Sequence, residues 1–306
     1  MTAVLNQWSE RPGGPGGHSF GAINGNPSSA TPGPPGPPTI LREPSMYVTT
    51  PRPRPAGKAR AVAAALVLAA GSLTAVAAAS GPAVADAQVC EQFGSVSTPG
   101  GYIVQNNAWG TTAPQCVDQS GDGFTLSRAD GSVPTNGAPK SYPSIYAGCH
   151  YTNCSPGTVL PKKVSAIGSA PSRIAYRYTD GAVYDAAYDI WLDPEPKTDG
   201  VNRTEIMIWL NKVGPVQPIG SKTGSTTIAG QNWDVWKGSN GSNDVVSYVA
   251  PGALAGLDFD VKDFVNGAIA EGLATPEWYL TSVQAGFEPW ENGAGLAVTD
   301  FSLSVG

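Results

Sequence analysis

Residues 205–210 read Glu205-Ile-Met-Ile-Trp-Leu210, an alternation of two kinds of side chain that is typical of a β-strand. Successive side chains of a strand point to opposite faces. One face is aliphatic and suits the core of a β-sandwich: Ile206, Ile208 and Leu210. The other face combines a carboxylate, a thioether and an indole, which suit the floor of a cleft: Glu205, Met207 and Trp209. An ordinary half-exposed strand with a solvated glutamate is the alternative, and this segment alone leaves both open.

Segments of the same kind recur along most of the chain. From Cys90 onward, short alternating stretches are separated by Gly, Pro, Asn and Asp, a pattern that favours a sandwich or a barrel. The candidate strands are Tyr102–Asn107, Phe124–Arg128, Arg173–Tyr178, Tyr184–Leu192, Glu205–Leu210, Gln231–Lys237, Asn243–Val249, Trp278–Glu288 and Gly295–Val305. We therefore predict an all-β fold of mostly antiparallel sheet in one domain.

One segment departs from the strand pattern. Residues 260–272 place an apolar set on one face of a helix: Val261, Phe264, Val265, Ala268 and Ile269. Asp260 can serve as its N-cap and Gly272 as its C-terminal stop. We expect a single amphipathic helix packed on the outside of the sheets.

Two more predicted strands carry acidic side chains. In residues 281–290, Glu288 shares a polar face with Ser282, Gln284 and Gly286. Gly286 is expected to leave room for a ligand beside the backbone, and Pro289 is expected to end the strand.

In residues 184–192, Asp189 shares a face with Ala187 and Trp191. An aspartate among apolar neighbours needs a hydrogen-bond partner or a function. A structural hydrogen bond is therefore the alternative to a catalytic role.

Two carboxyl groups on either side of one bond are what glycosidic cleavage requires. One attacks the anomeric carbon or activates water there, and the other protonates the leaving oxygen. Aromatic rings offer flat platforms for sugars, and Trp109 lies among hydrogen-bonding amides in Gln105-Asn-Asn-Ala-Trp-Gly110, although burial in a core is the commoner fate of tryptophan. A serine triad lacks a plausible base, because His150 lies in a loop flanked by cysteines.

The N-terminal part has the composition of a disordered leader. Residues 11–55 are rich in Pro and Gly and poor in large apolar side chains, so they have little to bury. We expect residues 1–57 to form this leader, unless Met46 is the true start of translation.

A secretory signal is predicted next, in residues 58–87. Basic residues precede the apolar run Ala61–Ala70, and a small-x-small site ends at Ala87. A membrane anchor is the alternative, but Gly71, Ser80 and Pro82 interrupt the apolar stretch. We expect cleavage after Ala87, secretion, and no stable membrane association of the remaining domain, residues 88–306.

The predicted mature domain is acidic. Residues 88–306 carry 12 Lys and Arg and 21 Asp and Glu, a formal net charge of −9. This charge argues against nucleic acid as a partner, because phosphate backbones are bound by basic surfaces. The negative charge would not oppose the binding of a neutral polymer.

All four cysteines lie in this domain: Cys90, Cys116, Cys149 and Cys154. An even number behind a secretory signal indicates two disulfides, for which the sequence allows three pairings. No Cys-x-x-Cys occurs, and His150 is the one histidine of this domain, so neither a zinc site nor another metal site is expected.

These segments together resemble glycoside hydrolase family 12. The similar pieces are Asn106–Gly110, Ser144–Cys154, Ala187–Trp191, Glu205–Asn211 and Gly286–Trp290, in family order. The resemblance implies a β-jelly roll, a sandwich of two antiparallel sheets, and a secreted endo-β-1,4-glucanase without a cofactor. It also implies the nearest-neighbour disulfides, Cys90–Cys116 and Cys149–Cys154.

The resemblance further implies roles for individual residues. Glu205 would be the nucleophile, Glu288 the general acid/base, and Asp189 a hydrogen-bond partner of the nucleophile. The expected substrate-binding residues are Asn107, Trp109, His150, Tyr151, Met207 and Gln284. The mechanism would be retaining, which requires the two carboxyl groups to lie about 5–5.5 Å apart.

The predicted substrate is cellulose or mixed-linkage β-glucan, and the predicted state is a monomer. A xyloglucanase or another β-glycanase on the same fold is one alternative, because a fold does not determine the substrate. A non-catalytic secreted carbohydrate-binding protein is the other.

Overall fold

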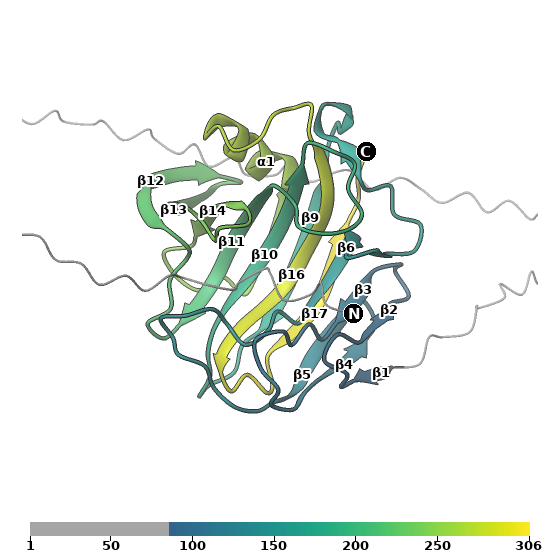
Figure 1. Cartoon of the computed structure of the whole chain (residues 1–306), viewed down its shortest axis with the longest axis vertical. Helices are drawn as coiled ribbons and strands as arrows, with labels where there is room; N and C mark the ends of the chain where they lie inside the picture. Colours follow the sequence, from purple (N-terminus) through teal and green to yellow (C-terminus); the bar gives the residue numbers. More distant parts are fainter. Residues whose placement is uncertain (1–85) are drawn as a thin grey trace, which may run out of the picture. The chain divides into compact units, whose positions relative to one another are not determined.

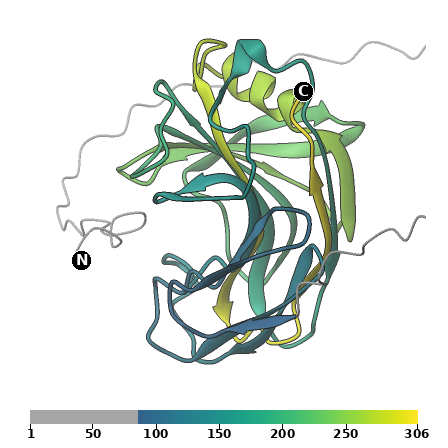
Figure 2. The ribbon, with the colours of Figure 1, turned by 90° about the vertical axis from the view of Figure 1, so that its right-hand side faces the viewer.

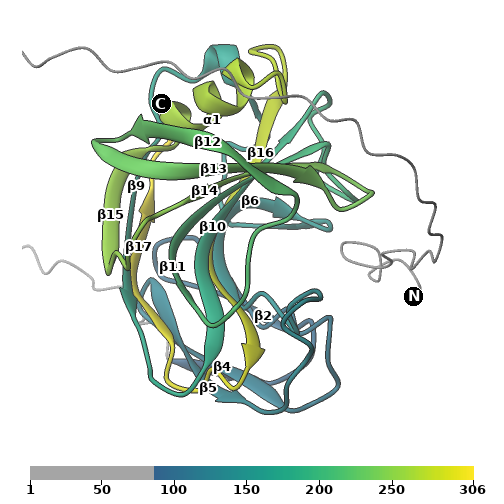
Figure 3. The same cartoon turned by 90° about the vertical axis from the view of Figure 1, so that its left-hand side faces the viewer.

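The computed structural model describes residues 86–306, so the predicted leader and nearly all of the predicted signal segment lie outside the described residues. Two β-sheets stack to form a sandwich (Figure 1). Figures 2 and 3 show that both sheets curve in the same direction, so that the larger sheet presents a concave face to the open side. The expected all-β sandwich is confirmed.

The smaller sheet has six strands and forms the outer layer of the described part. Their spatial order is β1 (Ala87–Val89), β4 (Gln115–Ser120), β5 (Gly123–Ala129), β17 (Ala297–Leu303), β9 (Pro171–Arg177) and β15 (Gly256–Asp260). All of its pairs are antiparallel.

The larger sheet provides the concave face. Its order is β12 (Ser221–Ile228), β13 (Gln231–Ser239), β14 (Asp244–Val249), β11 (Thr204–Val213), β10 (Val183–Asp193), β16 (Tyr279–Glu291), β6 (Ser144–His150), β3 (Ile103–Gln105) and β2 (Ser95–Ser97). Two short strands pair with β6 and β16, namely β7 (Asn153–Cys154) and β8 (Lys162–Lys163). Pairing is antiparallel except between β11 and β14, which run parallel.

The core between the sheets is filled as the alternation of β11 predicts. Ile206, Ile208 and Leu210 are fully buried there. Each such side chain stabilises the fold by roughly 1.5–3 kcal/mol relative to an exposed one. The opposite face of β11 is thereby turned to the concave side.

The predicted helix is present as α1 (Val261–Ala270). The Asp260 side chain accepts a hydrogen bond from the Lys262 amide at 2.9 Å, which makes it the N-cap. Gly272 has a φ of +76°, the left-handed conformation expected just past a helix. Phe264 is fully buried against the rings of Trp233, Tyr248 and Phe259.

The prediction that Pro289 ends its strand is wrong, because β16 runs on to Glu291. Pro289 pairs with Tyr184 of β10 on one side, whereas β6 pairs with β16 only as far as Gly286. The other side of β16 has no strand partner at this point, so a residue without an N–H is tolerated. The Pro289 carbonyl accepts a hydrogen bond from the Lys140 amide on that free side.

Both disulfides have the nearest-neighbour pairing, Cys90–Cys116 and Cys149–Cys154. The second disulfide closes the turn between β6 and β7. His150 lies inside the closed loop, directly after Cys149, and Ser155 directly follows Cys154. Within residues 86–306, no helix has the length and apolar character needed to cross a membrane.

Candidate active site

A small cavity, open to solvent, lies on the concave side of the larger sheet. Its lining brings together residues from four strands and the loops beside them: Asn107, Trp109, Tyr142, His150, Asp189, Trp191, Glu205, Gln284 and Glu288. Seven of these nine are residues that the sequence predicts as catalytic or substrate-binding. Tyr142 and Trp191 are additional.

Three neighbouring strands supply the acidic floor of this cavity. Along the central strand β10, Trp191 pairs with Glu205 of β11, and Asp185 pairs with Glu288 of β16. Asp189 lies between these two positions on the same face. The two predicted catalytic glutamates therefore approach the cavity from opposite sides of β10.

Glu205 is 1% exposed and accepts a hydrogen bond from Asn243 Nδ2 at 3.1 Å. Asn243 directly precedes β14, the strand that runs parallel to β11. Burial raises the pKa of Glu205 to about 8, while the Asn243 amide opposes this shift because it stabilises the carboxylate. Asn243 thus favours the ionised form that a nucleophile needs.

Glu288 is 3% exposed on β16. Burial raises its pKa well above the ordinary value, and the neighbouring carboxyl of Asp185 raises it further, through its charge and through a hydrogen bond. The charge of Glu205 acts in the same direction. These effects favour the protonated form of Glu288 that a general acid needs.

Asp189 is 3% exposed and pairs with Met207 on one side and Gln284 on the other. Its pKa is raised by burial and then by the charges of Glu205 and Glu288, and a hydrogen bond from Tyr142 opposes the rise. The side-chain donor that reaches Glu205 is Asn243. The expected hydrogen bond between Asp189 and the nucleophile stays a prediction.

A chain of amides crosses the floor beside these carboxyls. His150 Nδ1 lies 2.9 Å from Gln105 Oε1, Gln105 Nε2 donates to Gln284 Oε1 at 3.1 Å, and Gln284 Nε2 donates to Ser282 Oγ at 3.1 Å. Because an amide oxygen only accepts, Nδ1 of His150 carries the proton and Nε2 is an acceptor. Burial lowers the pKa of His150 to about 4, so the ring is neutral near pH 7.

The remaining predicted residues lie at different depths. Asn107 and Trp109 line the cavity. The Tyr151 ring meets the His150 ring edge-on at 4.8 Å, beside the cavity lining. Met207 is 1% exposed and belongs with Trp209 to a buried cluster on the face of β11 that carries Glu205, so it lies beside the site without lining the cavity.

Gly286 does not leave room for a ligand, so that expectation is wrong. A Cβ at this position would come within 2.1 Å of the Pro143 carbonyl oxygen and 2.8 Å of Ser144 Cα. The glycine lets β6 and its preceding segment approach β16 closely beside Glu288.

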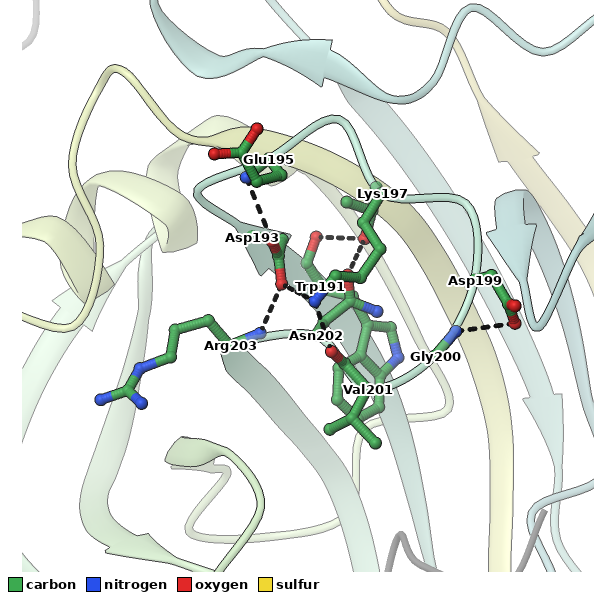
Figure 4. Close-up of polar contacts among 10 residues, drawn as sticks. Trp191, Asp193, Glu195, Lys197, Asp199, Gly200, Val201, Asn202 and Arg203 are labelled. Carbon is green, nitrogen blue, oxygen red and sulfur yellow. Dashed lines mark hydrogen bonds and ion pairs between the residues drawn. The ribbon is translucent and has the colours of Figure 1, made fainter. Parts of the chain in front are cut away.

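A well-anchored connection between β10 and β11 borders the site (Figure 4). Asp193 is 2% exposed and accepts hydrogen bonds from the amides of Glu195 and Arg203, both at 3.0 Å, and from Lys197 Nζ at 2.8 Å. The Thr198 carbonyl accepts a hydrogen bond from the Thr152 amide, which ties this loop to the disulfide-closed turn after His150. The loop thereby fixes the chain just before Glu205.

Besides Tyr142 and Trp191 in the lining, three functional positions were not predicted from the sequence: Asp185, Gln105 and Asn243. Asp185 was within reach, because it shares the alternation of Ala187 and Asp189 on β10. Gln105 and Asn243 reach the site because of strand pairings that no local sequence pattern predicts. In the described part of the chain, no group of three His, Cys, Asp or Glu side chains is arranged to hold a metal ion.

Comparisons with known proteins agree with this geometry. The model of the family "Glycosyl hydrolase family 12" matches residues 100–306. The probable cellulase Cel12b of Mycobacterium tuberculosis (strain ATCC 25618 / H37Rv) is 51% identical over 149 residues, which are 49% of this chain and 99% of that protein.

Two further similarities span about three quarters of the chain. A probable xyloglucan-specific endo-β-1,4-glucanase A from Aspergillus terreus (strain NIH 2624 / FGSC A1156) is 33% identical, covering 72% of this chain and 88% of that protein. The solved native structure of the endo-1,4-β-glucanase CelB2, a cellulase, is 62% identical with a TM-score of 0.72, covering 72% of this chain and all of that one (100%).

Proposed function

The chain belongs to glycosyl hydrolase family 12, and we propose that it hydrolyses internal β-1,4-glucosidic bonds of cellulose or mixed-linkage β-glucan with retention of configuration. One observation carries this proposal: Glu205 and Glu288 are both buried and line the same open cavity from opposite sides of β10. Two carboxyl groups placed on either side of a bound chain are the machinery of glycoside hydrolysis.

In the first step, the Glu205 carboxylate attacks the anomeric carbon while the Glu288 proton passes to the glycosidic oxygen. The bond between the anomeric carbon and the glycosidic oxygen breaks. In the second step, Glu288 takes a proton from water, the water oxygen attacks the anomeric carbon, and the Glu205 carboxylate leaves. The different environments of the two glutamates support this assignment. Asn243 stabilises the charge on Glu205, whereas Asp185 and burial favour the proton on Glu288.

The sugar contacts follow from the donors and acceptors at the cavity wall. Neutral His150 offers Nε2 as an acceptor for a sugar hydroxyl, and the rings of Trp109 and Trp191 provide apolar faces. An unbranched glucan is favoured over xyloglucan, because the similar endo-1,4-β-glucanase CelB2 is 62% identical whereas the xyloglucan-specific relative is 33% identical. That relative makes xyloglucanase activity the second candidate.

Secretion, a monomeric state and the division into leader, signal and catalytic domain are proposals as well. The signal-like pattern before Gln88 and the two disulfides in the folded part support export to an oxidising compartment. N-terminal sequencing of protein from the culture medium should show that the secreted chain begins at Gln88. Size-exclusion chromatography should give a single peak at the mass of a monomer. A start elsewhere or a dimer would correct these proposals.

The activity is tested by incubating the protein with carboxymethylcellulose, barley β-glucan, xyloglucan and xylan and measuring new reducing ends. We expect the barley glucan and carboxymethylcellulose to be cleaved fastest. Proton NMR of the first products should detect the β-anomer before mutarotation, because a double displacement retains configuration. An α-anomer as first product, or no reducing ends from any glucan, would overturn the proposed function.

A further inference from the structure

Asp185 is a buried carboxyl group that neither attacks the sugar nor transfers a proton to it in either proposed step. It is 0% exposed, it pairs with Glu288 across β10 and β16, and it does not line the cavity. Neither of its buried carboxyl oxygens has a conventional hydrogen-bond donor, and the side chain that acts on them most directly is the facing Glu288 carboxyl. Asp185 therefore meets the general acid and not the substrate.

The groups around Asp185 offer no positive charge to compensate it. The titratable groups that act on it electrostatically are Asp189 of β10, Glu205 of β11, Tyr176 of β9 and Tyr142 of the segment before β6. Its pairing partner on β11 is Lys212, whose ammonium group instead donates to the Val216 carbonyl at 3.0 Å.

Two carboxyl groups in this position cannot both be ionised at low cost, because like charges repel strongly where water is excluded. A carboxyl–carboxyl hydrogen bond also requires one proton between the two groups. A proton on Glu288 relieves this repulsion, and the interaction between the two groups raises the pKa of Glu288 while its hydrogen-bond part lowers that of Asp185. Burial and this neighbour both raise the pKa of Glu288.

We propose that Asp185 is a positioning residue for Glu288: it accepts a hydrogen bond from the Glu288 carboxyl and so orients the acid and keeps its proton until the leaving oxygen takes it. The inference rests on the proposed function, since it assigns Glu288 the role of acid/base. In the first step the proton moves from Glu288 to the glycosidic oxygen while Glu205 becomes a neutral ester. The net charge of the carboxyl cluster is unchanged by that transfer.

The same contact helps the second step. Once Glu288 has given up its proton, two carboxylates lie side by side in a buried site. Their repulsion makes Glu288 a stronger base for the proton of the incoming water. Asp185 would thus act on both half-reactions without touching the sugar.

The test is the pH dependence of kcat/KM on barley β-glucan for wild type and Asp185→Asn. The asparagine keeps the shape but removes the anionic acceptor, so the basic limb should move to lower pH by at least about one unit. At pH values above the wild-type limb this corresponds to a tenfold or larger loss. The loss should be much smaller on 2,4-dinitrophenyl β-cellobioside, whose leaving group needs no protonation.

Asp193→Asn is the matched control, because Asp193 is also a buried aspartate of β10 but its hydrogen bonds go to the following loop and none goes to Glu288. We expect it to lower the melting temperature and to leave the basic limb in place. A lower activity of Asp185→Asn with an unmoved basic limb, or an equal loss on both substrates, would overturn the inference.

A titration separates this inference from the proposed function and from failure to fold. In wild-type protein labelled with ¹³C at Glu and Asp carboxyls, Glu288 and Asp185 should titrate in two linked steps. Independent titration of the two groups would refute the pairing even if Asp185→Asn is insoluble. If wild type cleaves no glucan, the proposed function fails, whereas active wild type with an unshifted variant refutes the role of Asp185 alone.

Discussion

Asn243 donates a hydrogen bond from Nδ2 to Oε2 of Glu205 over 3.1 Å, and both side chains are buried. The contact joins two parallel strands, since Asn243 directly precedes β14 and Glu205 is the second residue of β11. It is the interaction that opposes the effect of burial on the pKa of Glu205. The charge of the nucleophile therefore depends on an amide 38 residues away.

Replacement of Asn243 by alanine should raise the pKa of Glu205 beyond the value of about 8 that it has with the hydrogen bond. The acid limb of the kcat/KM profile should then move to higher pH, because a smaller share of Glu205 is ionised at any pH below its pKa. A hydrogen bond to a charged group contributes about 1.5–3 kcal/mol, so kcat/KM on the acid limb should fall roughly 10- to 150-fold. Ser247→Ala, a buried change on β14 away from Glu205, is the control and should leave the limb unmoved.

Chemical rescue should separate the two glutamates. In Glu288→Ala, azide can enter beside the glycosyl-enzyme and attack it, so an activated aryl β-cellobioside should yield a β-glycosyl azide. In Glu205→Ala, azide should replace the nucleophile and yield an α-glycosyl azide. NMR of the two products is the measurement. The same anomer from both variants would contradict the assigned roles.

Much of this site follows from strand alternation alone. Glu205, Asp189 and Glu288 lie on the concave face because their spacing from aliphatic neighbours requires it. Asp185 obeys the same rule and could have been predicted with them. The helix was also predictable, because Asp260 and Gly272 delimit an apolar face of the right period.

What escaped prediction depends on which strands become neighbours. Asn243 reaches Glu205 only because β14 pairs in parallel with β11, and Gln105 reaches His150 only because β3 pairs with β6. β6 (Ser144–His150) is buried on both faces and β12 (Ser221–Ile228) is mostly exposed, so neither strand has the alternation that identifies a half-buried strand. Pro289 was misjudged for the same reason, since whether a strand needs its N–H depends on the partner.

The buried carboxyl groups should make the fold less stable as pH rises. Burial raises the folded-state pKa of Glu288 above its ordinary value of 4.5. The stability that the neutral carboxyl group contributes is therefore fully present below pH 4.5. It is lost as the pH rises through the folded-state pKa. Glu288→Gln cannot ionise. Its melting temperature should exceed that of wild type by a margin that grows from pH 4.5 upward, reaching at least about 2–4 °C, or about 1 kcal/mol.

Differential scanning calorimetry at a series of pH values measures this margin. Glu277→Gln is the matched control, because Glu277 is an exposed glutamate paired with Lys163 on the surface. It should show no such growth with pH. A margin for Glu288→Gln that shrinks as pH rises would mean that the wild-type carboxyl is stabilised in its ionised form.

The Asp193 anchor should contribute to stability and to the placement of Glu205. Asp193→Ala removes the buried acceptor that two backbone amides and Lys197 share, and so releases a loop whose other residues are mostly exposed (Figure 4). The expected loss in the free energy of unfolding is about 2–4 kcal/mol. Lys197→Met removes only the partly exposed ion pair and one carbonyl contact, so it should cost less than about 1 kcal/mol.

Urea denaturation followed by tryptophan fluorescence compares these two variants with wild type. Asp193→Ala should also raise KM for β-glucan, because the loop that it holds contacts the turn after His150. Equal destabilisation by both variants would place the stabilising effect in the ion pair and not in the backbone contacts.

Lys140 should prove essential for the loop behind Glu288, although its charge takes no part in the chemistry. It is 0% exposed, and its ammonium group donates to the carbonyls of Ala129, Asp130 and Gly131 at 3.0–3.1 Å. Its own amide donates to the Pro289 carbonyl, next to Glu288, and its carbonyl accepts from Gly110, next to Trp109. One buried cation thus joins the turn after β5 to both sides of the cavity.

In Lys140→Met the three carbonyls lose their donor while the volume is nearly kept, so the free energy of unfolding should fall by roughly 3 kcal/mol and the melting temperature by roughly 6–12 °C. Lys140→Gln, which retains a two-hydrogen donor, should lie between Met and wild type. At a temperature where all three proteins are folded, the two variants should lose activity because KM rises, since the displaced segment carries Trp109. The limbs of the pH profile should not move. A melting temperature unchanged in the methionine variant would mean that water can satisfy those carbonyls, and that the loop is held by its backbone contacts to Pro289 and Gly110 alone.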